Sequence, residues 1–227
     1  MKTSKIWSIC LTFFGFIFIV AFSIALPIWF RPFYYWCIDW LEIEDYSGFT
    51  REQIVTAYND VLNYLNFGTP FGTGELKYSQ EGKSHFEDCK ILFDLDTWAL
   101  IISSVVLIVA LILKKAKILA PAKILKCDWF MFSGLFALII PIVLGAAIAV
   151  DFTKAFEIFH KIFFPGKDNW VFDWWDDQII RILPAEFFMY CGIMIAVLLF
   201  ALAGVAIGIG ISRAVKYKKI EKNLIEK

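Results

Sequence analysis

Residues 6–30 read IWSICLTFFGFIFIVAFSIALPIWF, an apolar run without Asp, Glu, Lys, Arg or His. A helix needs about 20 such residues to cross the hydrocarbon core of a bilayer, so this stretch predicts a membrane span. Residues 97–113, 129–150 and 187–212 are also charge-free and apolar. Because only helices or closed barrels span membranes, we expect an all-α integral membrane protein with four transmembrane helices.

Basic residues are distributed unevenly between these spans. Most of them precede the first span, lie between the second and third, or follow the fourth: Lys2, Lys5, Lys114, Lys115, Lys117, Lys123, Lys126, Arg213, Lys216, Lys218, Lys219, Lys222 and Lys227. The positive-inside rule therefore predicts cytoplasmic termini, a cytoplasmic Lys-rich loop and an extracellular cap. The expected divisions are an N-terminal span (1–30), a cap segment (31–96), two spans with the loop (97–150), a second cap segment (151–186) and the last span with its tail (187–227).

Overall composition narrows the function classes. The formal net charge is zero, and no basic stripe with interleaved aromatics suggests a nucleic-acid partner. A cleaved signal peptide is the alternative for the first span, but the apolar run exceeds an ordinary signal core of about 7–15 residues. Cys37 and Cys89 both fall outside the spans, where an oxidising compartment allows a disulfide, and spacing leaves the pairing open.

The cap sequences contain several helix signals. Residues 50–53 (TREQ) match a capping box, and residues 84–87 (SHFE) match a second one, which would start a helix leading into the second span. A third helix is expected over 151–164 and a short amphipathic one over 176–183. A short strand is expected around residues 76–78, within a turn-rich stretch that contains Gly72, Gly74 and Gly82.

Only two histidines occur, His85 and His160, and both lie in the predicted cap. Neutral imidazoles move protons near neutral pH without a cofactor, whereas spans free of ionisable groups argue against a transporter. His85 is expected in the first turn of a helix, where the helix dipole keeps the ring neutral. Asp88, three residues on, would orient that ring.

Two other uses of these residues remain open. A catalytic zinc usually takes three protein ligands and the HExxH motif is absent, so a His85–His160 metal site completed by Asp88 or Asp173 is a minor alternative. A thiol–imidazole pair of Cys89 and His85 ranks below it, because a cysteine entering an apolar span should have a raised pKa and be unreactive.

Two blocks resemble a known family. Residues 84–90 (SHFEDCK) and 159–166 (FHKIFFPG), the latter followed by Trp170, resemble the two histidine blocks of the lipoprotein intramolecular transacylases, and the four-span layout resembles that family over the whole chain. Cys89 departs from the aliphatic residue expected there. The resemblance implies a bacterial plasma-membrane acyltransferase that makes lyso-form lipoprotein, by moving the sn-2 acyl chain of a diacylglyceryl lipoprotein to its N-terminal cysteine amine.

The resemblance also implies site residues and partners. His85 and His160 would be the catalytic pair on the extracellular side, one as general base and the other as general acid, with the assignment of the two roles left open. No cofactor or metal is expected, and the partners would be lipoproteins held at the membrane lipid. Asp88 and Lys90 are expected in support, and the expected substrate-binding aromatics are Phe86, Phe159, Phe163, Trp170, Trp174 and Trp175. The alternatives are a non-enzymatic membrane module that binds a partner or lipid, and a metal-dependent membrane hydrolase.

Overall fold

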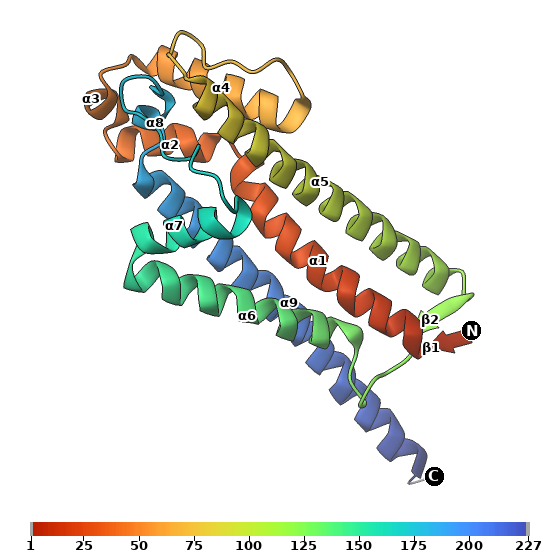
Figure 1. Ribbon diagram of the computed structural model, residues 1–227. Helices are drawn as coiled ribbons and strands as arrows, with labels where there is room; N and C mark the ends of the chain where they lie inside the picture. The colour runs from red at the N-terminus through yellow and green to blue at the C-terminus, as the bar shows by residue number, and fades with distance from the viewer. Residues whose placement is uncertain (1, 226–227) are drawn as a thin grey trace. The chain divides into compact units, whose positions relative to one another are not determined.

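The computed structural model describes residues 2–225, and most of them are helical (Figure 1). Met1, Glu226 and Lys227 lie outside the described residues, so the end of the predicted cytoplasmic tail does too. Within residues 2–225 the elements are β1 (Lys2–Ser4), α1 (Lys5–Trp29), α2 (Pro32–Trp40), α3 (Ile43–Ser47), α4 (Arg51–Phe67), α5 (Gln80–Lys115), β2 (Leu119–Pro121), α6 (Trp129–Val150), α7 (Phe152–Phe163), α8 (Ile179–Ile182) and α9 (Ala185–Ile225). Four of these helices, α1, α5, α6 and α9, are long and apolar enough to cross a membrane, which confirms the expected fold class.

The chain forms two compact units. The membrane unit comprises the described residues of Met1–Ile24, Trp98–Leu144 and Ile195–Lys227, and the cap unit comprises Ala25–Thr97 and Gly145–Met194. The division into five segments that the sequence suggests stays a prediction.

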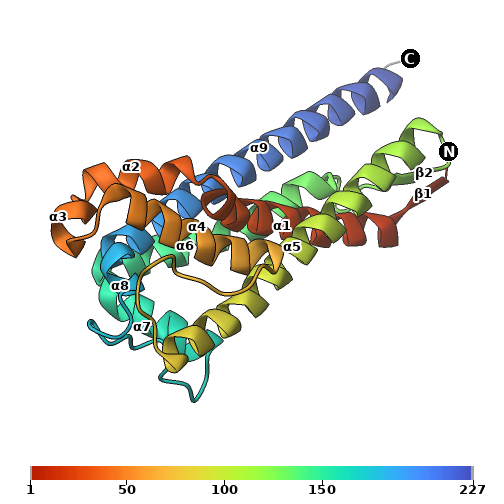
Figure 2. The same ribbon diagram turned by 90° about the horizontal axis from the view of Figure 1, so that it is seen from above.

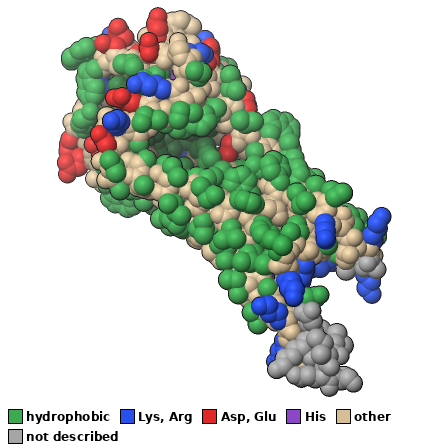
Figure 3. Space-filling model, turned by 60° about the horizontal axis from the view of Figure 1, so that its bottom comes forward, with side chains coloured by type: hydrophobic (Ala, Val, Ile, Leu, Met, Phe, Trp, Pro, Cys, Tyr) green, Lys and Arg blue, Asp and Glu red, His purple; other side chains and the backbone are tan. Residues whose placement is uncertain are grey.

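In the membrane unit, small and aliphatic side chains of α1, α6 and α9 pack into one core, exemplified by Ile19, Ala137 and Leu199. Figure 3 shows a mainly hydrophobic surface on the visible face of the spans, with Lys and Arg side chains gathered towards one end. The sequence did not predict the short parallel pairing of β1 with β2. It joins the chain's beginning to the Lys-rich loop, so both lie at the same end of this unit.

Helix α5 is longer than a bilayer requires. Its 36 residues would extend about 54 Å at 1.5 Å per residue, whereas the hydrocarbon core is about 30 Å thick. The charge-free part is residues 97–113; residues 80–96 carry all the acidic side chains of α5 together with Lys83 and Lys90, and Lys114 and Lys115 end the helix. We therefore treat 97–113 as the membrane-spanning part of α5, and residues 80–96 as its extension in the cap unit.

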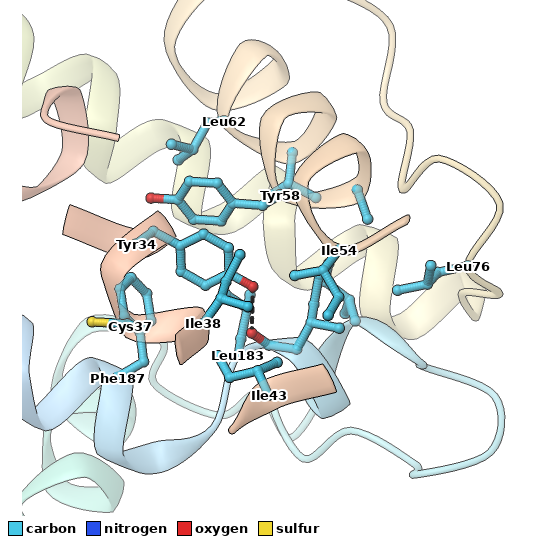
Figure 4. Close-up of a cluster of buried hydrophobic side chains, with 14 of the residues drawn as sticks. Tyr34, Cys37, Ile38, Ile43, Ile54, Tyr58, Leu62, Leu76, Leu183 and Phe187 are labelled. Carbon is cyan, nitrogen blue, oxygen red and sulfur yellow. Dashed lines mark hydrogen bonds between the residues drawn. The ribbon is translucent and has the colours of Figure 1, made fainter. Parts of the chain in front are cut away.

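The cap unit has its own hydrophobic core. Helices α2, α3, α4 and α8 gather around it (Figure 2), and Figure 4 shows Tyr34, Ile54 and Tyr58 among its side chains. The Tyr34 hydroxyl donates a hydrogen bond of 2.7 Å to the Ile182 carbonyl, which satisfies a polar group that burial would otherwise leave unpaired. Cys37 is fully buried in this core, and both Cys37 and Cys89 are free thiols.

The first predicted capping box is confirmed, because the Thr50 side chain accepts from the Gln53 N–H and the Gln53 side chain accepts from the Thr50 N–H. The second, at residues 84–87, is wrong. Helix α5 begins at Gln80, one turn earlier, and the Ser79 hydroxyl accepts its cap hydrogen bond from the Gly82 N–H at 2.8 Å. Glu87 forms an ion pair with Lys83 instead of capping the helix.

Gly82 explains why the sequence suggested a turn where the structure has a helix. A Cβ at this position would lie 2.1 Å from Asp177 Oδ1. Asp177 is buried and accepts hydrogen bonds from the Ser79 N–H and hydroxyl, at 2.8 and 3.0 Å, so a carboxylate sits at the N-terminus of α5. Glycine is needed here for close approach, not for chain reversal.

The strand expected at residues 76–78 is also wrong. This segment is a loop held by Gln178, whose side chain accepts from the Lys77 N–H at 2.8 Å and whose N–H donates to the Lys77 carbonyl at 3.0 Å. The short helix expected over 176–183 appears as α8, and the helix expected over 151–164 appears as α7 with Asp151 as its N-cap.

Candidate active site

The two histidines lie together in the cap unit. His85 comes from the extension of α5 and His160 from α7, and their ring centroids are 5.5 Å apart with 34° between the ring planes. Each residue is only 6% exposed. Two imidazoles separated by 75 positions in the sequence therefore share one largely apolar environment.

One ring nitrogen of His160 has a defined role. Nδ1 lies 2.8 Å from the Phe156 carbonyl, one turn back on α7. A carbonyl oxygen only accepts, so Nδ1 carries the proton, and in the neutral ring Nε2 keeps its lone pair. Burial lowers the pKa of His160, although the hydrogen bond to Phe156 acts in the opposite direction. The ring is therefore neutral at pH 7, with Nε2 available as a base.

His85 is held differently. Its Nε2 lies 3.3 Å from the Cys89 Sγ, one turn further along α5, and its Nδ1 is buried without a hydrogen-bond partner among the described residues. Burial, and next the neighbouring His160, lower the pKa of His85 to about 4. The ring is neutral as expected, but the expected reason is wrong. His85 lies beyond the first turn of α5, and burial is the main cause.

Aromatic rings enclose the pair. Phe164 contacts both rings, with centroids 5.0 Å from His85 and 5.8 Å from His160. Phe172 packs edge-on against His85 at 5.5 Å, and Phe156 lies 4.3 Å from His160. These contacts exclude water from the imidazoles and account for the lowered pKa values.

Four of the six predicted substrate-binding aromatics lie at this enclosure. Trp170 stacks on His160 at 4.7 Å, and Phe159 packs edge-on against the same ring at 5.5 Å. Phe163 packs against Phe159, with ring centroids 4.6 Å apart. Phe86 is buried beside His85, at 6.1 Å.

The structure places the remaining two tryptophans elsewhere in the cap unit. Both stack with the Arg181 guanidinium, whose central carbon lies 5.2 Å from the Trp174 ring and 5.0 Å from the Trp175 ring. Trp175 is 71% exposed. They belong to a cluster around Arg181, not to the enclosure of the histidines.

Asp88 does not orient His85 through a hydrogen bond. Its carboxylate accepts from Lys167 Nζ at one oxygen and from Asn169 Nδ2 at the other, the latter at 3.0 Å. Burial alone would raise the pKa of Asp88, but the hydrogen bonds from Lys167 and Asn169 outweigh it and lower the pKa. Asp88 therefore links α5, which carries His85, to the loop that follows α7, which carries His160.

The hydrogen bonds of Lys90 also join parts of the fold and do not involve either histidine. Its ammonium donates to the Leu65 carbonyl at 3.3 Å and to Asp94 at 3.2 Å. Leu65 belongs to the last turn of α4, where carbonyls lack helical partners. Lys90 thus joins α5 to the end of α4.

The carboxylates considered for a metal site are engaged elsewhere. Asp173 accepts from the N–H groups of Trp175 and Asp176, at 2.7 and 3.0 Å, and Asp88 bonds Lys167 and Asn169. Across residues 2–225, no group of three or more His, Cys, Asp or Glu side chains is arranged to hold a metal ion.

Sequence reasoning did not assign roles to Phe164, Lys167, Asn169 and Phe172. All four follow His160 within the loop after α7, where Gly166 adopts a φ of +73°. The Trp170 Nε1–H donates to the Lys167 carbonyl at 3.0 Å, which fixes the stacked indole. A helix end followed by Pro-Gly is the signal that the chain turns back over its own histidine.

Asn169 carries a second unpaired buried atom. Its Nδ2 donates to Asp88, and more weakly to Ser84 Oγ at 3.4 Å, while its Oδ1 is buried without a partner among the described residues. The amide cannot be reversed, because its oxygen would then face a carboxylate. An acceptor at Asn169 and a nitrogen of His85 are thus both left free for a ligand.

Comparisons with known proteins bear on this arrangement. The family description "Lipoprotein intramolecular transacylase Lit" matches residues 9–188. A solved structure of the membrane integral lipoprotein intramolecular transacylase Lit from Bacillus cereus superposes with a TM-score of 0.81 at 25% identity, covering 95% of this chain and 97% of that chain. No curated protein sequence matches significantly.

Two further structures are of the same Bacillus cereus protein with mutations. The H85R structure has a TM-score of 0.75 and 25% identity, over 96% of this chain and 94% of that chain. The H85A structure has the same TM-score and identity, over 95% of each chain. Since the family match covers most of the sequence, the chain belongs to the lipoprotein intramolecular transacylases and is a membrane-embedded transferase.

Proposed function

We propose that this protein moves the sn-2 acyl chain of a diacylglyceryl lipoprotein to the amino group of the lipoprotein's own N-terminal cysteine. The product is a lyso-form lipoprotein. The observation that carries the proposal is the pair of buried, neutral imidazoles, 5.5 Å apart between ring centroids, inside an aromatic enclosure. An ester becomes an amide in this reaction, so it needs no external energy source.

His160 is the better candidate for the general base. Its Nδ1–H is committed to the Phe156 carbonyl, so the lone pair of Nε2 is free to accept a proton. The attacking amine has a reference pKa of about 7.7–8.0 and must lose a proton to form the amide. A neutral imidazole with a lowered pKa is suited to accept that proton as the C–N bond forms.

His85 is the better candidate for stabilising the oxyanion. With its pKa lowered to about 4 the ring starts neutral, so it acts by hydrogen bonding and not as an imidazolium acid. A neutral imidazole in an apolar site can polarise a carbonyl in this way. Its unpaired Nδ1 is the atom available to donate.

The proton and bond changes balance within one substrate. The amine nitrogen attacks the sn-2 ester carbon, and His160 accepts the proton from the nitrogen. The carbon–oxygen bond to glycerol then breaks, and His160 returns the proton to the glyceryl oxygen. Both reacting ends belong to one molecule, so holding them in place lowers the barrier without a covalent enzyme intermediate.

Neighbouring groups have supporting roles. Asn169 Oδ1 is a buried acceptor without a partner in residues 2–225. It is the candidate to orient the substrate amine, by accepting a hydrogen bond from one of the amine's N–H groups. Trp170, Phe159 and Phe163 would confine the acylated cysteine. Phe159 and Phe163 are each about half exposed, so they present apolar surface to the acyl chains.

The proposed orientation places both termini in the cytoplasm and the histidine pair on the extracellular side. The positive-inside rule supports this orientation. In the membrane unit, β1 pairs with β2 of the Lys-rich loop, and Lys123 of that loop lies 3.8 Å over the Tyr217 ring of α9. The three basic segments thus belong to one end of that unit.

A crossover experiment tests the proposal. A lipopeptide with heavy isotopes in both its peptide and its sn-2 acyl chain is mixed with the unlabelled form and incubated with the purified protein in lipid nanodiscs. Mass spectrometry should find only fully heavy and fully light lyso-form products. Mixed products would contradict intramolecular transfer. Release of free fatty acid, abolished by a chelator, would favour the metal-dependent hydrolase.

A further inference from the structure

Cys89 lies against the catalytic pair without a part in the proposed proton transfers. It follows His85 by one turn of α5, and its Sγ lies 3.3 Å from His85 Nε2. Burial, and next the neighbouring Asp88 carboxylate, raise the pKa of the Cys89 thiol to about 12. The sulfur therefore keeps its hydrogen at neutral pH and is unsuited to act as a nucleophile.

The thiol can serve as a hydrogen-bond donor. A neutral imidazole has one donor and one acceptor nitrogen, and which nitrogen carries the proton is set by the partner of the other. If the S–H donates to Nε2, the proton must reside on Nδ1. The opposite arrangement pairs Nε2–H with a weakly accepting sulfur and leaves Nδ1 with only a lone pair.

The second observation is the environment of Nδ1 itself. His85 is 6% exposed, and Nδ1 is buried without a partner in residues 2–225. Among these residues, therefore, no hydrogen bond to Nδ1 determines whether it carries the proton. The Cys89 sulfur is thus the one hydrogen-bond partner of the His85 ring among the described residues.

We infer that Cys89 is a positioning residue that fixes the His85 tautomer with the proton on Nδ1, so that an N–H faces the carbonyl oxygen of the acyl ester. The role in catalysis rests on the proposed function, whereas the tautomer does not. His160 presents an acceptor instead: the Phe156 carbonyl holds its proton on Nδ1, so its Nε2 keeps a lone pair. One ring then offers a donor and the other an acceptor.

The test uses the fact that the chain has only two histidines. Protein labelled with ¹⁵N-histidine in nanodiscs gives signals from two rings, which replacement of His160 by Gln assigns. In the wild type, His85 should show a protonated Nδ1 and an unprotonated Nε2. In Cys89→Val, which removes the donor at similar volume, the proton should move to Nε2 or divide between the nitrogens.

Two further variants sharpen the result. Cys89→Ser restores an O–H donor and should return the wild-type tautomer. Cys191→Val alters another cysteine of the cap unit, which packs against its core, and should leave the His85 signals unchanged. If Cys89→Val folds poorly, Cys89→Ala removes the same donor and serves in its place.

Activity provides the second readout. Cys89→Val should lower kcat by about 2- to 10-fold, as expected for one neutral hydrogen bond, with KM unchanged and recovery in Cys89→Ser. A wild-type His85 protonated on Nε2, or a spectrum that Cys89→Val leaves unaltered, would overturn the inference. If the wild type shows the expected tautomer but converts no lipopeptide, the proposed function fails and the tautomer assignment stands.

Discussion

Phe164 offers the most direct control of the histidine chemistry. This residue is 5% exposed and contacts both imidazoles, with centroids 5.0 Å from His85 and 5.8 Å from His160. Burial is the largest cause of the lowered pKa of His85, so Phe164→Ala should admit water and raise that pKa from about 4 towards 6.5.

The size of the effect on the reaction rate follows from the two limiting pKa values of His85, about 4 when buried and 6.5 when fully hydrated. At pH 6, a ring with a pKa of about 4 is roughly 1% protonated, whereas a ring near 6.5 is roughly 76% protonated. If only neutral His85 donates correctly, full loss of the shift would lower the rate at pH 6 by roughly fourfold and leave it unchanged at pH 8. Partial loss gives a smaller fall in the same direction.

The assay is the initial rate of lyso-form production at pH 6 and pH 8 with one lipopeptide. The substrate amine titrates identically for every variant, so the ratio of the two rates isolates the protein's contribution. Phe67→Ala is the matched control, since Phe67 ends α4 in the same cap unit and is 73% exposed. Removing a buried ring also costs stability, about 3–5 kcal/mol in well-packed cores, so Phe164→Leu provides a milder second variant.

Two outcomes would refute this reasoning. The rate ratio of Phe164→Ala could equal that of the wild type although both proteins are folded. Alternatively, the His85 ring of the wild type could titrate near pH 6.5 by NMR, which would mean that burial does not keep it neutral.

Two further predictions concern residues around the pair. Gly82→Ala should lower the free energy of unfolding by roughly 1–3 kcal/mol, since its Cβ would lie 2.1 Å from Asp177 Oδ1; thermal unfolding measures this against Gly208→Ala, whose Cβ meets nothing within 4 Å. Equal transition temperatures for the two would contradict it. Asn169→Leu should reduce kcat by about 10-fold or more through loss of the amine acceptor, whereas Ser84→Ala, which removes only the weaker 3.4 Å contact, should retain most activity. Similar rates for these two variants would argue against the role of Asn169.

Local patterns predicted the elements whose signals are complete within one segment. The apolar run of residues 6–30 gives α1, and the reciprocal hydrogen bonds of the capping box join Thr50 and Gln53, which are only three positions apart. The start of α5 was misread because its cause is distant. Gly82 resembles a turn residue until Asp177, 95 positions away, is seen against it.

The site shows the same limit. The two histidines could be identified because they are rare and lie outside the charge-free spans. The aromatic types around them were expected too, but sequence does not give the direction in which a ring points. Trp174 and Trp175 lie with Arg181, whereas Phe164 and Phe172 pack on His85, because the loop after α7 folds back over α5. Tautomers likewise depend on contacts such as that between Cys89 and His85.

The central claim is that both imidazoles act on one acyl transfer. The rate of lyso-form production should be measured for His85→Gln, His160→Gln and the double variant, with Glu81→Gln and Lys161→Gln as exposed controls on the same two helices. Each single variant should lose roughly 10²–10⁴-fold, and the double variant should lose far less than the product of the two. A folded single variant with wild-type activity would contradict the claim.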